Sequence, residues 1–170
     1  MQRGAGTQSQ RHFHGVERVT KAASSRRLRV LTVLDSPTDQ GGAERFAVGL
    51  ATHLPRDRFE PWLCSTRSAT PEAAEQLAEA EVPHISLGRK SKVDVHRLSG
   101  LATLAKREKF DVLHAHMFGS NAWGTVLGRL GGVPVVIAHE HNWAQAGSPA
   151  RRVIDRHVIA RWATRFVTVS

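Results

Sequence analysis

The chain alternates between short apolar runs and longer amphipathic stretches from about residue 28 onward. Each run holds four to seven residues and is rich in Val, Leu and Ile, a pattern typical of strands buried on both faces of a parallel sheet. These runs predict six strands, over residues 29–34, 59–65, 82–87, 111–115, 133–138 and 166–169.

Each stretch between two runs has the spacing or the composition of a helix. In the first stretch, Phe46, Leu50 and Leu54 recur every fourth residue, which predicts a helix with these side chains toward the core. In the last stretch, the Arg151-Arg152 pair is expected on a solvated helix face. The inward face of that last helix, over residues 149–163, is expected to contain Val153, Ile154, His157, Val158 and Trp162. Further helices are predicted over residues 71–81, 94–108 and 120–130.

Strands that alternate with helices of this length imply right-handed crossovers and a parallel sheet with helices on both faces. The predicted fold class is therefore α/β. In such folds ligands bind in the loops that follow the carboxyl ends of the strands. Functional residues are therefore expected in the loops after the first, fourth and fifth strands.

The first 27 residues depart from this pattern, being rich in Gln, Ser, Gly and Arg with no apolar periodicity. They carry six basic residues against Glu17, so that +5 of the formal net charge of +9 belongs to this segment. We expect residues 1–27 to be a disordered basic tail, because they cannot bury enough surface to offset chain entropy. With Phe13 as its only aromatic residue the tail has little to stack on bases, and we expect no nucleic-acid partner.

Composition excludes several other classes of protein. No stretch approaches the roughly 20 apolar residues that span a bilayer, although the basic surface leaves peripheral contact with anionic lipid open. Cys64 is the one cysteine, which excludes an intramolecular disulfide framework. Because it lies within an apolar run, we expect a buried, inert thiol and a reducing compartment.

A Gly41-Gly42 pair precedes the first predicted helix. Glycines allow a ligand to approach the backbone closely, and the free N–H groups at a helix N-terminus favour an anion such as a phosphate. The spacing is not that of the G-x-G-x-x-G dinucleotide fingerprint. The alternative is a plain strand-to-helix turn, with Glu44 as a surface acid that the helix dipole favours.

Histidines gather at the ends of the fourth and fifth strands. His114 and His116 are two residues apart and therefore face the same way on a strand, and His139 and His141 follow the next strand. Together with Glu140 they have the composition of a metal site, as in a metal-dependent hydrolase. The alternative is a set of packed, hydrogen-bonded histidines.

Polar and aromatic residues follow these histidines along the chain. Asn121, Trp123, Asn142 and Trp143 could offer hydrogen bonds and a stacking face to a sugar. Either tryptophan could equally belong to the core.

Several of these segments, taken in order, resemble a known family. They are Val30–Leu34 with the following Gly41-Gly42-Ala43-Glu44-Arg45, then residues 111–116 (DVLHAH), 135–140 (VVIAHE) and 167–170 (VTVS). In this order and spacing the chain resembles the N-terminal domain of family 4 glycosyltransferases, which have the GT-B fold. The resemblance covers about residues 28–170. It implies a Rossmann-like doubly wound parallel sheet, the acceptor-side half of a two-domain GT-B architecture.

The resemblance also implies an activity and roles for residues. It implies retaining transfer of a sugar, of the hexosyltransferase type, from a nucleotide diphosphate sugar to an acceptor hydroxyl on a saccharide or lipid-linked molecule. Gly41 and Gly42 would approach the donor diphosphate, and His116 would contact the transferred sugar as the catalytic residue. No divalent metal or other cofactor is expected. The acceptor side of the cleft would be lined by the 139–143 loop, with Asn121, His139, Glu140, His141 and Asn142 as sugar-binding residues.

The chain departs from the family in one respect. The family's donor-binding signature, two glutamates eight positions apart, lies in a C-terminal domain that we expect to be absent from this chain. We therefore expect this domain to be inactive alone, and the full-length enzyme to work in the cytoplasm at the inner face of the cell membrane. The alternatives are a non-catalytic module that binds a sugar, a glycan or a partner domain, a GT-B sugar-nucleotide epimerase, and, less favoured, the metal-dependent hydrolase.

Overall fold

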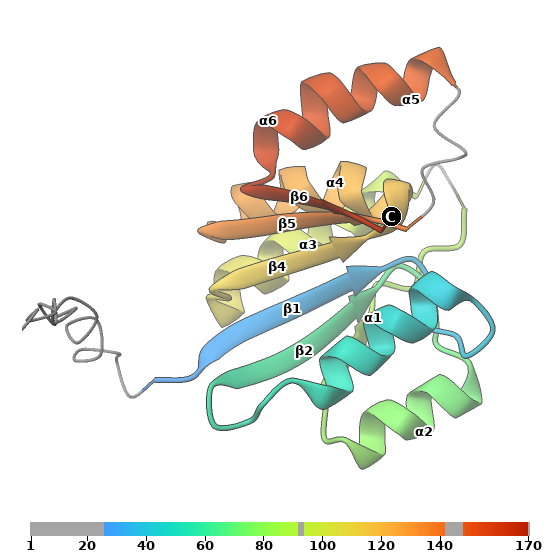
Figure 1. The fold of residues 1–170 in the computed structure, drawn as a ribbon, viewed down its shortest axis with the longest axis vertical. Coiled ribbons are helices and arrows are strands. Elements are labelled where there is room, and N and C mark those ends of the chain that lie inside the picture. Colours follow the sequence, from blue (N-terminus) through green and yellow to red (C-terminus); the bar gives the residue numbers. More distant parts are fainter. Residues whose placement is uncertain (1–25, 92–93, 142–147, 170) are drawn as a thin grey trace, which may run out of the picture.

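The computed structural model describes residues 26–91, 94–141 and 148–169, which form a parallel sheet with helices on both faces (Figure 1). The strands are β1 (Leu28–Leu34), β2 (Phe59–Ser65), β3 (His84–Ser86), β4 (Val112–His116), β5 (Val135–Glu140) and β6 (Arg165–Thr168). The helices are α1 (Gly42–His53), α2 (Pro71–Glu79), α3 (Val95–Glu108), α4 (Met117–Leu130), α5 (Pro149–Ile154), the π-helical turn η2 (Asp155–Ile159) and α6 (Ala160–Trp162).

The strands lie in the order β3-β2-β1-β4-β5-β6, and each pairs with its neighbours in parallel. This is the strand order of a doubly wound Rossmann-like sheet, so the predicted fold class is confirmed. The order reverses between β1 and β4, where the chain crosses from one half of the sheet to the other. Ligands of open α/β sheets bind outside the carboxyl ends of the strands at such a switch point.

The core lies in two layers, one on each face of the sheet. Helices α1 and α2 pack on one face, in a cluster that includes Leu34 and Leu63. Helices α3 and α4 pack on the other, against Leu113, Ala115 and Val136. Alternate residues of a strand point to opposite faces. The side chains of β4 on either side of Ala115 therefore face the layer of α1.

Glycines bring α4 unusually close to the sheet. A Cβ atom at Gly128 would lie 2.7 Å from Cδ1 of Leu113, and one at Gly124 would lie 3.3 Å from Cβ of Ala115. The helix also begins earlier than the predicted residue 120, at Met117, which has a left-handed φ of 68°. Strand β4 therefore passes directly into α4, and the N-terminus of that helix is held at the carboxyl edge of the sheet.

Two predicted strands have bounds that differ by more than one residue from the observed ones. Instead of residues 82–87, β3 contains only His84–Ser86, since Pro83 has no N–H to donate to a ladder. Instead of ending at residue 138, β5 continues to Glu140. His139 and Glu140, which were predicted to lie in a loop, are therefore part of the sheet.

The predicted inward faces of the first and last helices are partly wrong. In α1 the core face is formed by Ala47, Val48 and Ala51, while Phe46 is 47% exposed. The predicted helix over residues 149–163 contains the turn η2, whose wider i→i+5 spacing rotates the residues after it. Val153, which precedes this turn, is exposed, as is His157 within it, and the buried residue of this segment is Ile159.

Candidate functional site

The carboxyl edge at the switch point brings the four predicted histidines together. His116 ends β4 and lies directly opposite His139 of β5 in the parallel register. His114 is two residues earlier on the same face of β4, and His141 follows the end of β5. The H-x-H spacing in two adjacent, in-register strands thus places four imidazoles on one side of the sheet.

The four rings form one group of stacked and tilted pairs, which we call the histidine cluster. Ring centroids lie 4.2 Å apart for His114 and His116, and 4.0 Å apart for His139 and His141. The planes of His114 and His139 are within 5° of parallel at 5.4 Å. Nδ1 of His116 lies 3.0 Å from Nε2 of His141, so one of these two nitrogens donates a hydrogen bond to the other.

The histidine cluster is buried at His116 and His139 and half-buried at His114 and His141, and burial keeps it uncharged. The side chains of His116 and His139 are 0% and 5% exposed. Burial and the neighbouring imidazoles lower the pKa of His114 to about 4 and that of His116 to about 2. The pKa values of His139 and His141 are also lowered, again mainly by burial. At neutral pH the cluster therefore offers neutral imidazoles, each able to donate one hydrogen bond and accept another.

Phe46 covers the histidine cluster from α1. Its ring centroid lies 5.3 Å from those of His139 and His141 and 6.1 Å from that of His116. The helical face that Phe46 shares with Leu50 predicts a core position for its side chain. Its partial exposure beside polar rings instead makes it a functional candidate that periodicity alone could not identify.

Asn121 holds the end of β5 in place. Its Nδ2 donates to the carbonyl oxygen of His139 at 3.1 Å, and the N–H of His139 donates to its Oδ1 at 3.2 Å. The side chain is fully buried. The Asn121 amide is thus hydrogen-bonded to the main chain of His139, and these bonds fix α4 to β5 at the site.

Glu140 lies on the opposite face of β5 and forms a buried ion pair. Nη2 of Arg151 is 2.6 Å from Oε2 of Glu140, and the two side chains are 13% and 5% exposed. The Arg151 guanidinium also lies 4.5 Å from the centroid of the Phe118 ring. The prediction that Arg151 belongs to a solvated face is therefore wrong. The pairing joins the start of α5 to the end of β5, beside the histidine cluster.

The predicted glycine pair lies at the same edge, after β1. Gly41 is the N-cap of α1 and Gly42 its first residue. A Cβ atom at Gly42 would meet nothing within 4 Å, whereas one at Gly41 would fall 1.9 Å from Oε2 of Glu44. Gly42 thus faces open space, and the carboxylate of Glu44 folds back against Gly41.

Three residues of the histidine cluster have the geometry of a cation site. His114, His116 and His139 each offer a ring nitrogen, and these nitrogens lie within 4.8 Å of one another. Nε2 of His114, Nε2 of His116 and Nδ1 of His139 are buried and have no hydrogen-bond partner within the part of the chain that the structure describes. These are the residues that could hold a metal ion.

The remaining predictions have mixed outcomes. Cys64 is buried, as predicted, and burial raises the pKa of its thiol to about 12. Trp123 packs against the core. Asn142 and Trp143 lie outside the described residues, as does the tail up to residue 25. Among the described helices, none is long and apolar enough to cross a bilayer.

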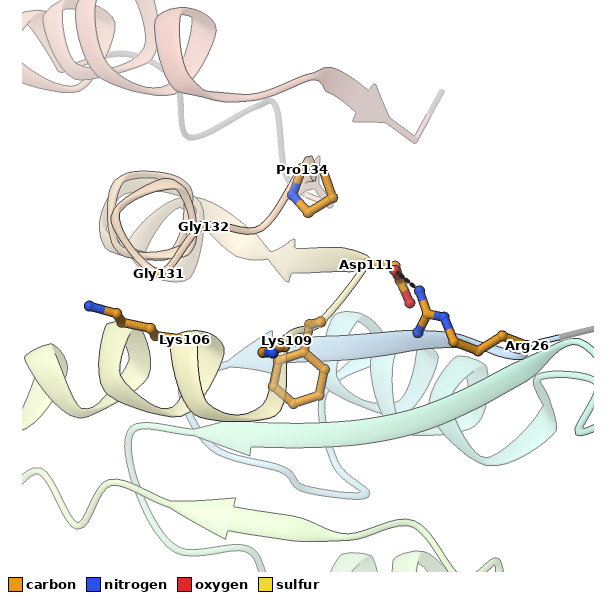
Figure 2. Close-up of a pocket in the computed structure, with 8 residues that line it drawn as sticks. Arg26, Lys106, Lys109, Asp111, Gly131, Gly132 and Pro134 are labelled. Carbon is orange, nitrogen blue, oxygen red and sulfur yellow. Dashed lines mark hydrogen bonds and ion pairs between the residues drawn. The ribbon is translucent and has the colours of Figure 1, made fainter. Parts of the chain in front are cut away.

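A pocket of about 450 Å³ lies at the opposite, amino-terminal edge of the sheet (Figure 2). Lys106, Asp111 and Pro134 contribute to its lining, and Nη2 of Arg26 lies 2.5 Å from Oδ1 of Asp111. None of the predicted site residues lines this pocket. The candidate site is therefore the carboxyl edge, where the chemistry-bearing residues gather.

Comparisons with known proteins bear on the family and the fold of the chain. A family model described as Glycosyltransferase Family 4 matches residues 40–170, well over half of the chain. No curated protein matches the sequence.

Among solved structures, Alr3699/HepE from Anabaena in complex with UDP and glucose is 14% identical with a TM-score of 0.65. That match covers 82% of this chain and 37% of HepE. MurG from Acinetobacter baumannii is 17% identical with a TM-score of 0.58, covering 84% of this chain and 41% of MurG. At these identities the likeness shows a shared fold, and this chain spans well under half the length of either protein.

Proposed function

This chain belongs to glycosyltransferase family 4, and we propose that it is the acceptor-side half of a retaining hexosyltransferase. The reaction would move a hexosyl group from a nucleotide diphosphate sugar to a hydroxyl of a saccharide or lipid-linked acceptor. The C1–O bond to the diphosphate breaks, a bond from C1 to the acceptor oxygen forms with the same configuration, and the acceptor proton is released.

One observation carries this proposal: the histidine cluster and the N-terminus of α1 lie at the same edge of the sheet. Phe46, four residues after Gly42 in α1, contacts three rings of the cluster. A donor whose diphosphate lies at the helix N-terminus would thus have its sugar close to His116. This is also the edge at which ligands of doubly wound sheets bind.

His116 is the residue that we propose acts on the transferred sugar. Its Nδ1 is engaged by His141, which orients the ring, and its Nε2 is unpartnered among the described residues. Because its pKa is held near 2, it would act as a neutral hydrogen-bonding group and not as a cation. Its contribution would be to orient a sugar hydroxyl and to stabilise charge that develops in the transition state.

Gly42 is the proposed contact for the donor diphosphate. The open space at its Cα would admit a phosphate oxygen, and the free N–H groups of the first helical turn favour an anion. The carboxylate of Glu44 would have to swing away from Gly41 as the donor binds. The complex of HepE with UDP-glucose supports a nucleotide sugar as the donor class.

The remaining parts of the proposal concern residues and partners around this centre. His139 and His141 would contact the sugar or the acceptor, and Asn121 and Glu140 would hold their strand in position. A C-terminal domain would supply most of the donor site, and without it we expect no turnover. We propose that the transfer needs no metal ion and takes place in the cytoplasm at the inner membrane face.

Product stereochemistry tests the proposal. The complete gene product is incubated with a panel of UDP-, GDP- and ADP-hexoses and simple alkyl glycosides, and the first product is followed by proton NMR of its anomeric signal. Retention predicts a product with the anomeric configuration of the donor. Turnover with inversion would contradict the retaining mechanism, and no turnover of any donor would contradict the transferase assignment.

A further inference from the structure

We propose that His114, His116 and His139 form a binding site for a divalent transition-metal ion of the type that imidazole prefers, such as Zn²⁺. This site goes beyond sugar transfer, for which we expect no metal. The inference rests on the donor set that the two adjacent strands bring together.

The geometry of the three rings is close to that of a three-histidine site. A ring nitrogen of each lies within 4.8 Å of the other two. In a tetrahedral zinc site, with Zn–N bonds of about 2.0–2.1 Å, ligand nitrogens lie about 3.4 Å apart. Side-chain rotations that shorten the separations by up to about 1.4 Å would therefore close the site around an ion.

Unpaired ring nitrogens on the same three histidines are the second observation that supports the site. Each of the three histidines carries a buried, unpaired ring nitrogen, although buried polar atoms in proteins are nearly always satisfied. His116 and His139 are more than nine-tenths buried. Three neighbouring histidines that each carry an unpaired nitrogen, and that each offer a ring nitrogen within 4.8 Å of the other two, are most simply explained by a common ligand.

The surroundings of His116 also suit a metal ligand. Histidines that bind metal usually engage their second ring nitrogen in a hydrogen bond that fixes the ring. The pairing of His116 Nδ1 with His141 Nε2 provides this bond and leaves Nε2 of His116 free for the ion. With three protein ligands, a fourth position would remain for water.

Metal binding would affect the transfer site directly. Because His116 belongs to both proposals, an ion held by the three rings would withhold its imidazole from the sugar. Metal and sugar would then compete for one residue. The metal site itself can be tested without donor or acceptor, so its failure is distinguishable from failure of the transferase proposal.

The test is titration of the chain with ZnCl₂ by calorimetry and with CoCl₂ by visible absorption. Two histidines of the tail also have H-x-H spacing, so His12→Ala and His14→Ala are introduced first to remove them. We expect one Zn²⁺ per chain and the d–d absorption of four-coordinate Co²⁺. His114→Asn and His139→Gln should each weaken zinc binding. The loss of affinity should exceed the roughly 10–100-fold that follows mutation of a residue that is only hydrogen-bonded to a metal ligand.

Matched controls separate the site from general affinity and from misfolding. His96→Ala removes a histidine whose side chain is 77% exposed, and zinc affinity should stay unchanged. Saturating Zn²⁺ should raise the Tm of the parent chain but not that of folded His114→Asn. Absence of saturable binding to the parent, or equal binding by the parent and both cluster variants, would overturn the proposal.

Discussion

At the scale of single residues, the site is defined by neutral rings under a partly exposed aromatic side chain. The histidines were identified from sequence, because an H-x-H pattern places two side chains on one face of any strand. Their mutual contacts depend on the register of β4 against β5, which one sequence does not specify. Phe46 was missed because its helical spacing matches that of a core residue, although the core face of α1 is made of smaller side chains.

Substitution of Gly42 should change the KM for the donor without lowering the stability of the protein. Gly42→Ala adds a Cβ atom that meets nothing in the chain. It should leave the protein as stable or stabilise it by up to about 1 kcal/mol, since Ala is the better helix former. In the complete gene product it should raise the KM for the nucleotide sugar by crowding the diphosphate.

The matched control for that experiment is Gly49→Ala, which lies in the same helix and also adds a Cβ atom in open space. It should leave the donor KM unchanged. Equal donor KM values for wild type and Gly42→Ala would remove the phosphate role from this glycine.

Asn121 leads to a prediction about stability. Asn121→Ala removes both hydrogen bonds to the main chain of His139 inside the protein, so the free energy of unfolding should fall by about 1–3 kcal/mol. Denaturant unfolding measures this. Leu130→Ala, at a side chain of α4 that is 64% exposed, should change stability by less than about 0.5 kcal/mol. A similarly small effect at Asn121 would show that its amide is not needed to hold β5.

At the scale of elements, most strands and helices follow from the apolar pattern, and the errors have local causes. The proline before β3 shortens that strand, and the turn η2 changes which residues of the last helix face inward. The ion pair of Arg151 with Glu140 joins residues from separate elements. Because an adjacent pair of arginines is usually a solvated surface, no local signal distinguishes Arg151 from Arg152.

The ion pair gives a prediction for the docking of α5. Arg151→Ala leaves the carboxylate of Glu140 buried without this guanidinium, and the free energy of unfolding should fall by about 3–5 kcal/mol. Arg152→Ala, at the exposed neighbouring position, should change it by less than about 0.5 kcal/mol. Thermal and denaturant unfolding of the two variants provide the comparison. Equal stability of the two would show that the pair does not hold the helix.

At the scale of the whole molecule, the order of the strands brings the motifs that carry Gly42 and His116 together in one site. The sequence predicted the α/β class and the elements that carry Gly42 and His116. It did not by itself place β1 beside β4, because strand order depends on contacts between residues far apart in the chain. The observed order puts both motifs at the switch point. The matching family model then places the chain in glycosyltransferase family 4.

The central claim is that His116 acts on the transferred sugar. It is tested most directly by the turnover of the complete gene product carrying His116→Ala. The control variant is His84→Ala, which removes another hydrogen-bonded imidazole, one that is half-buried. We predict that kcat falls roughly 10²–10³-fold in His116→Ala, as when one transition-state hydrogen bond is lost, with a much smaller change in Tm, and that His84→Ala retains its kcat. A His116→Ala enzyme whose folded fraction turns over at the normal rate would contradict the account.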